Sequence, residues 1–247
     1  MCAIGMEFLT HELLIALGVA VAAGLMRGFA GVGSGMLMAP VFAILFGPVQ
    51  TVAIIILMEV VVTAQLLPGV RREINWRIVA PMGFAAALLM PVGSWLLVSL
   101  DPALLVRGIA IVVVVFSLIL MVGWRYEGEK RLWASLGVGG ISGVLIASTS
   151  LGNPPVMVYL LSGRDTAATN RANFTGFFAV TLVALIAMMA LAGLIDRDAI
   201  VTAAMLLPVF MLGAWIGSRL FRKSSEALYR RVALGLLLCV GLYGLLR

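Results

Sequence analysis

Two ionisable residues interrupt long apolar stretches of the sequence, and their chemistry suits an anion and a proton. Arg27 follows an apolar segment, and Glu59 lies within IIILMEVVVTAQ, with Thr63 one turn further along the same helical face. A charged residue in the middle of a membrane costs about 2.5–3.5 kcal/mol even on lenient scales, so it is a functional candidate by default. Arg27 is predicted to bind an anion and Glu59 to carry a coupling proton. The alternative for both residues is a structural ion pair with each other, and Arg27 could also snorkel to the membrane interface.

Small and polar residues gather at two breaks in the apolar pattern. The first break is RGFAGVGSG, residues 27–35, and the second is STSLGNPP, residues 148–155, where two prolines disfavour a helix. A helix beginning after each break, near Ser34 and near Asn153, would present unpaired N–H groups and partial positive charge to an anion. The predicted substrate-binding residues are therefore Arg27, Gly31, Gly33, Ser34, Gly35, Ser148, Thr149, Ser150, Asn153 and Asn173.

Structural roles are the alternatives for several of these residues. The glycines could instead let helices pack closely, as small residues do in membranes. Asn173 belongs, with Arg171 and Thr175, to the early part of a span whose place in the second half corresponds to that of Glu59. Arg171 could equally anchor that span at the cytoplasmic surface. Ligand binding and structural support therefore both stay open.

The elements that position these residues are membrane helices. Of the 247 residues, 63% are hydrophobic and 11% are charged, whereas soluble domains carry about 25% charged residues. Apolar stretches long enough to cross about 30 Å of hydrocarbon recur along the chain. The net charge of +6 comes from basic residues between these stretches, where orientation signals belong, so no nucleic-acid partner is expected. The lipid bilayer is the predicted surrounding.

The chain divides into two similar halves, residues 1–123 and 132–247, joined by a polar linker at 124–131. Each half opens with a broken apolar segment. Cleaner spans follow at 50–70, 78–100 and 103–122, and at 166–194, 199–220 and 226–246. Three pairs of motifs recur in the same order: GFAG and GISG, Pro40-Val41 and Pro155-Val156, and GSW and GAW. This pattern indicates an internal duplication.

Basic residues favour a re-entrant hairpin for the second broken segment. If that segment returns to its own side, 13 of the 17 Lys and Arg residues face the cytoplasm and three face out, with Arg27 inside the membrane. This asymmetry is what the positive-inside rule expects. Symmetry and length favour a hairpin for the first segment too, although a crossing helix stays open there. The predicted fold is an all-α polytopic membrane protein. It has two inverted repeats, each a broken hairpin plus three transmembrane helices, or about eight membrane segments.

The sequence offers no support for catalysis, a cofactor or a metal site. Val32 breaks the G-x-S-G pattern of intramembrane serine proteases, and His11, the only histidine, is remote from Ser34 in the sequence. A nucleophile without a base is not activated. Cys2 and Cys239 stand alone at opposite ends, so neither a disulfide nor a metal site is indicated.

The segment GFAGVGSGMLMAPVF, with its counterpart GISGVLIASTSLGNPPVMVYLLS and the Gly-Ser/Ala-Trp segments, resembles the sulfite exporter TauE/SafE family, also called the toluene sulfonate uptake permease family. The resemblance covers nearly the whole chain. It implies transport of sulfite, organosulfonates and related anions across the bacterial inner membrane, coupled to an ion gradient. It carries over no site residues.

A secondary transporter for a small anion, a sulfur oxyanion or organosulfonate, is therefore the predicted function. A proton or another ion is the expected coupling partner. An anion channel is the first alternative, because it could use the same helix ends. A membrane-embedded enzyme or assembly factor is the second.

Overall fold

The computed structural model describes residues 2–99, 131–149, 154–161 and 165–225, together with five residues between 227 and 235. The predicted span at 103–122 lies outside these residues, as does almost all of the span at 226–246. The described elements are helices: α1 (Cys2–Ala30), α2 (Ser34–Phe46), α3 (Pro48–Val70), η1 (Arg71–Glu73), α4 (Trp76–Ser99), α6 (Leu132–Thr149), α7 (Pro154–Leu161), α8 (Ala167–Leu191) and α9 (Arg197–Lys223).

Five of these helices contain stretches long and apolar enough to cross a membrane. The stretches are Glu12–Ala30, Gln50–Glu73, Trp76–Leu96, Ala167–Leu191 and Arg197–Lys223. Large apolar side chains such as Leu88, Trp133, Val183 and Leu191 are exposed on the outside of the bundle. Exposed apolar surface on this scale suits lipid rather than water. The all-helical, multi-pass membrane class predicted from the sequence is confirmed.

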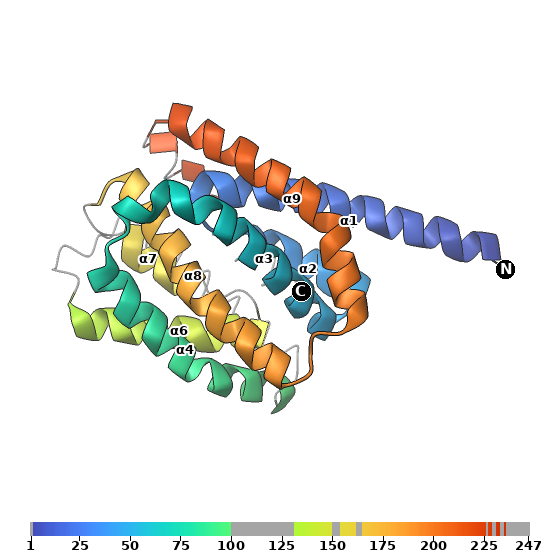
Figure 1. Cartoon of the computed structure of the whole chain (residues 1–247), viewed down its shortest axis with the longest axis horizontal. Helices are drawn as coiled ribbons and strands as arrows, with labels where there is room; N and C mark the ends of the chain where they lie inside the picture. Colours follow the sequence, from blue (N-terminus) through green and yellow to red (C-terminus); the bar gives the residue numbers. More distant parts are fainter. Residues whose placement is uncertain are drawn as a thin grey trace.

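Helices α3 and α8 cross the middle of the molecule, with α1 and α9 on one side and α4 and α6 on the other (Figure 1). Glycines allow the outer pairs to pack backbone against backbone. A Cβ atom added at Gly28 of α1 would lie 1.9 Å from the carbonyl oxygen of Ala214 on α9. One added at Gly143 of α6 would lie 2.1 Å from the carbonyl oxygen of Ala86 on α4. Small residues therefore set the close approach of both pairs.

Both breaks are shorter than the sequence suggests. Residues 27–30, expected to be a poor helix, complete the last turn of α1, and only residues 31–33 interrupt the helix. Gly31 (φ 77°) and Gly33 (φ 102°) adopt the left-handed backbone that other residues rarely tolerate. In the second half, α6 continues through Ser148 to Thr149. Packing of the flanking turns therefore overrides the weak helix propensity of these residues.

Local sequence explains where several helices begin. Pro48 opens α3, and the proline pair Pro154-Pro155 opens α7, where the missing N–H groups would have no helical partner anyway. Thr166 accepts a hydrogen bond from the N–H of Thr169 at the start of α8 (3.2 Å), and Asp196 accepts one from Ala199 at the start of α9 (2.7 Å).

The helix boundaries of the two halves recur at a nearly constant spacing. Ala30 and Thr149, which end α1 and α6, are 119 residues apart. The starts of α2 and α7 differ by 120 residues, those of α3 and α8 by 119, and those of α4 and α9 by 121. The Gly93 and Gly213 motifs keep this spacing, at 120 residues. The GFAG and GISG motifs, 112 residues apart, and the matched prolines, 115 apart, do not occupy equivalent positions.

Candidate functional site

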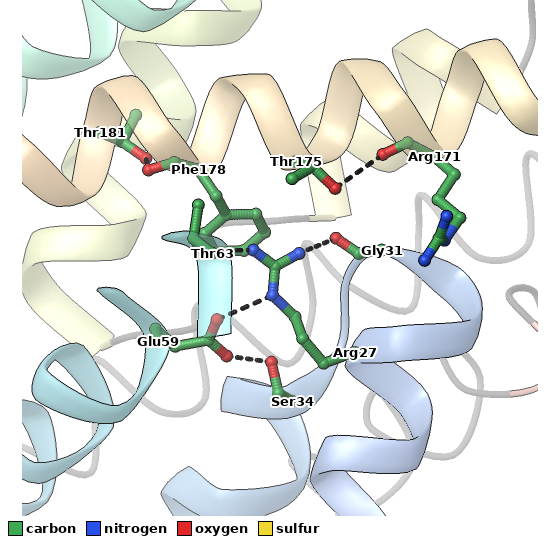
Figure 2. Close-up of polar contacts among 9 residues, drawn as sticks. All are labelled: Arg27, Gly31, Ser34, Glu59, Thr63, Arg171, Thr175, Phe178 and Thr181. Atoms are coloured by element: carbon green, nitrogen blue, oxygen red, sulfur yellow. Dashed lines mark hydrogen bonds and ion pairs between the residues drawn. The ribbon is translucent and has the colours of Figure 1, made fainter. Parts of the chain in front are cut away.

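The side chain of Arg27 is completely buried at the last turn of α1 and makes hydrogen bonds in three directions (Figure 2). Its Nε donates to Oε2 of Glu59 at 2.8 Å, and one Nη donates to Oγ1 of Thr63 at 2.8 Å. The other Nη donates to the carbonyl oxygen of Gly31, inside the break. The planar guanidinium thus joins the end of α1, the break and the middle of α3.

Both oxygens of the Glu59 carboxylate accept hydrogen bonds. Oε2 accepts from Arg27, and Oε1 accepts from the hydroxyl of Ser34, the first residue of α2. Glu59 is 2% exposed and Ser34 is fully buried. Residues flanking the break therefore hold a buried carboxylate, and the ion pair weighed as the alternative from sequence is present in the structure.

Phe178 of the second half completes the surroundings of Arg27. The Cζ atom of Arg27 lies 4.2 Å from the centroid of the Phe178 ring, a cation–π distance. Phe178 is the twelfth residue of α8, as Glu59 is the twelfth residue of α3. The guanidinium thus contacts a carboxylate from one half and an aromatic ring from the same position in the other.

A second arginine from the second half reaches the end of α1. Arg171 on α8 donates from Nε and one Nη to the carbonyl oxygen of Gly28, at 3.0 and 2.8 Å. Its guanidinium also lies 4.8 Å from the ring centroid of Phe221. A cation here satisfies a carbonyl group at the negative end of a helix. Arg171 is buried by this contact, so it makes a tertiary contact with α1 whether or not it also anchors the span at the membrane surface.

Gly31 lies directly against this second arginine. A Cβ atom at residue 31 would come within 3.0 Å of both Cγ and the carbonyl oxygen of Arg171. The absence of a side chain therefore lets the break approach α8 closely. This contact gives Gly31 a packing role besides its turn conformation.

Ser148 and Asn173, two of the remaining predicted residues, make hydrogen bonds to groups outside the Arg27 cluster. Ser148 is buried, and its hydroxyl donates to carbonyl groups of its own helix, Val144 at 2.8 Å and Leu145 at 3.3 Å. Asn173 accepts a hydrogen bond from the N–H of Asn75 at 2.8 Å, next to the start of α4. Thr149 ends α6, while Ser150 and Asn153 lie outside the described residues. Their binding of substrate stays a prediction.

A cavity of about 30 Å³ lies beside the Glu59 carboxylate, between the two broken segments. Gly35 borders it just after the first break, and Ile146 borders it one turn before the end of α6. Phe178 and aliphatic side chains of α3 and α8 close the rest of its wall. The space suits a single water molecule. It is too small for an oxyanion of four or more heavy atoms.

Thr63, Phe178 and Arg171 complete a site that sequence reasoning found only in part. Thr63 had a signal, since it follows Glu59 by one helical turn. Phe178 could have been found only from the repeat, because it follows Glu59 by 119 residues. Two of the motif pairs used to align the halves are 112 and 115 residues apart, so they do not give this spacing. Among the described residues, no three His, Cys, Asp or Glu side chains form a group able to hold a metal ion.

Comparison with known proteins agrees with the resemblance seen in the sequence. The family model described as Sulfite exporter TauE/SafE matches residues 16–244, nearly the whole chain. No curated protein and no solved structure matches it.

Proposed function

The chain belongs to the sulfite exporter TauE/SafE family, and on that basis we propose that it is a secondary transporter of a small sulfur-containing anion. The substrate class is a sulfur oxyanion or an organosulfonate, with sulfite as the first candidate. The proposed location is the bacterial inner membrane, and the proposed coupling partner is a proton.

The observation that carries this proposal is the buried Arg27 cluster at the first break. A cation inside a membrane helix is costly and marks a substrate or ion pathway by default. Arg27 presents a planar donor set suited to an oxyanion, and Ser34 adds a hydroxyl donor at the start of α2. Glu59, bonded to both, is the group that can take up and release a proton. We assign anion binding to Arg27 and Ser34, and coupling to Glu59.

The proposed architecture is a pair of inverted repeats, residues 1–123 and 132–247, joined by a cytoplasmic linker at 124–131. The recurrence of helix boundaries every 119–121 residues supports a duplication. Packing supports it too, because α1 of one half packs on α9 of the other, and α6 packs on α4 in return. Likewise α3 packs on α9, and its counterpart α8 packs on α4. Three full crossings in each half would give the halves opposite orientations.

The end of α9 supports a cytoplasmic position for the 221–225 region. Arg219, Arg222 and Lys223 are exposed in its last two turns, and Arg219 lies 3.7 Å from the ring centroid of Trp215. Basic and aromatic residues together are typical of the interface on the cytoplasmic side.

The cavity favours a transporter over a channel. The space beside Glu59 amounts to about 30 Å³, so the described packing leaves no room for the anion there. A site that must open to admit its anion suits alternating access, in which binding and release occur in different conformations. An open anion pore would need continuous space along its path.

Uptake into proteoliposomes tests the proposal. Sulfite, sulfate, thiosulfate, taurine and methanesulfonate would be offered with and without an imposed proton gradient. We expect saturable uptake of at least one sulfur anion that responds to the gradient. Arg27→Gln should abolish it, whereas the matched change Arg219→Gln, at an exposed arginine, should not. Uptake of none of these anions by the wild-type protein would contradict the proposed function.

A further inference from the structure

We propose that the carboxylate of Glu59 occupies the place of the transported anion, so that the anion binds only after Glu59 has taken up a proton. This inference rests on the proposed function and adds the order of events at the same site.

The donors assigned to the substrate are already engaged by Glu59. Arg27 donates to one carboxylate oxygen at 2.8 Å, and the Ser34 hydroxyl donates to the other. An incoming oxyanion needs these same donors. Because the adjoining cavity is only about 30 Å³, the anion does not fit beside an ionised Glu59. Substrate and carboxylate therefore compete for one place.

The net charge of the buried side chains also supports competition between the anion and the Glu59 carboxylate. In the described part of the chain, the buried charged side chains are Arg27, Glu59 and Arg171. With Glu59 ionised, they sum to one positive charge; protonation of Glu59 raises the sum to two. A bound monoanion returns it to one. The exchange of one resident negative charge for one substrate charge leaves the buried electrostatics unchanged, which a low-dielectric interior favours.

Among the described residues, the ionisable neighbours of Glu59 are few. Arg27 of α1 contacts it directly, and Arg171 is the one ionisable residue of α8. Helices α2 and α6, which border the cavity, carry none. The other ionisable residues of α1, η1 and α9 belong to the N-terminal part of α1, to η1 itself and to the end turns of α9; they are Glu7, His11, Glu12, Arg71, Arg72, Glu73, Arg197, Asp198, Arg219, Arg222 and Lys223. Protonation of Glu59 therefore acts chiefly on Arg27.

The transport step follows from this competition. A proton from the solution on one side forms an O–H bond on the Glu59 carboxylate, and its ion pair with Arg27 is lost. The anion then takes the donors of Arg27 and Ser34. Release on the other side reverses both events, and the carboxylate returns to Arg27. One proton and one monoanion move in the same direction, so the net flux of a monoanion carries no charge.

Equilibrium binding to the purified wild-type protein, over a series from acid to neutral pH, tests the competition. Methanesulfonate and sulfite are the probes, because methanesulfonate stays a monoanion throughout and sulfite does not. In the range where Glu59 is ionised, the affinity of the wild-type protein for methanesulfonate should fall by about tenfold for each unit that the pH rises, as linkage to one proton requires. Glu59→Gln, which mimics the protonated acid, should bind methanesulfonate with an affinity that does not change with pH.

Two further measurements keep the test decisive if Glu59→Gln folds poorly. Proton uptake on binding, followed with a pH indicator in weak buffer, should be one per methanesulfonate in the wild-type protein. If only sulfite binds, the wild-type measurement is made at a pH at which dissolved sulfite is already a monoanion, so that proton uptake reports on Glu59 and not on sulfite. Arg219→Gln, at an exposed arginine, is the control and should keep the wild-type pH dependence.

The outcomes separate this inference from the proposed function. Anion binding without proton uptake, or an equal pH dependence in wild type and Glu59→Gln, would overturn the competition while leaving a transporter in place. Binding of neither anion at any pH would contradict the proposed function itself, and the inference would fall with it.

Discussion

The guanidinium of Arg27 donates from Nε to Oε2 of Glu59 at 2.8 Å, linking the last turn of α1 to the middle of α3 across 32 residues of sequence. Both side chains are buried. Neither charge can be removed alone without leaving the other unpaired in a low-dielectric surrounding. The ion pair is therefore closed in this structure, and its proposed function depends on its opening.

Charge removal at this pair should be strongly non-additive in stability. Arg27→Gln and Glu59→Gln should each lower stability by about 3–5 kcal/mol, because each leaves an uncompensated buried charge. The double variant should recover most of this loss yet show no gradient-driven anion uptake. Thermal unfolding of the detergent-solubilised variants measures the first effect, and proteoliposome flux measures the second. Additive losses would contradict a direct pair, and normal flux in the double variant would remove both residues from the transport site.

Arg27→Lys should keep the ion pair but bind the anion more weakly. Lysine retains the charge but lacks the planar fork that reaches Glu59, Thr63 and Gly31 together. Loss of one charged hydrogen bond, at about 1.5–3 kcal/mol, predicts roughly tenfold to hundredfold weaker binding. Titration with the anion found in the uptake screen measures this. Wild-type affinity in Arg27→Lys would show that charge alone suffices.

Arg171→Gln should destabilise the contact between α8 and the end of α1. The change removes a charged donor from the Gly28 carbonyl group, to which Arg171 donates twice. Loss of this interaction should lower stability by about 1.5–3 kcal/mol. Arg219→Gln removes the same charge from an exposed position and serves as the control. Equal unfolding midpoints for the two variants would show that the hydrogen bonds from Arg171 to Gly28 do not stabilise the fold.

Gly28→Ala should separate α1 from α9, while Gly18→Ala on the same helix should not. The added Cβ at residue 28 would lie 1.9 Å from the Ala214 carbonyl oxygen, whereas the one at residue 18 meets nothing within 4 Å. Overpacking at residue 28 should cost about 1–3 kcal/mol. Alanine at residue 18 should stabilise the helix by about 0.5–1 kcal/mol. Unfolding midpoints of the two variants provide the comparison, and opposite signs are expected.

Cysteine labelling should place the two ends of the second broken segment on one side of the membrane. With Cys2 and Cys239 replaced by alanine, single cysteines at Leu132, at Gly163, which lies outside the described residues, and at Ser225 should react from the cytoplasm. A cysteine at Leu194, between α8 and α9, should react from outside. An impermeant thiol reagent on intact and opened cells gives the readout. Labelling of residues 132 and 163 from opposite sides would show a crossing rather than a hairpin.

The sequence by itself determined the class of protein and the main spans. The expected spans at 50–70, 78–100, 166–194 and 199–220 match α3, α4, α8 and α9 within a few residues. This agreement arises because an apolar run of bilayer length has one stable solution, a helix with its backbone hydrogen bonds satisfied internally. Arg27 and Glu59 could be identified as functional candidates from the sequence, because charged residues within such apolar runs are rare.

Only the tertiary structure decided what these charges do to one another. The sequence left Arg27 and Glu59 open as separate functional groups or as a pair, and the packing of α1 on its neighbours brings them together. Phe178 and Arg171 join the site from the second half through contacts between residues that are far apart in the sequence. Residues 27–30 and 148–149 also extend helices that their own propensities do not favour. Hydropathy and propensity are local quantities, whereas these outcomes depend on which helices meet, at what register and over which glycines.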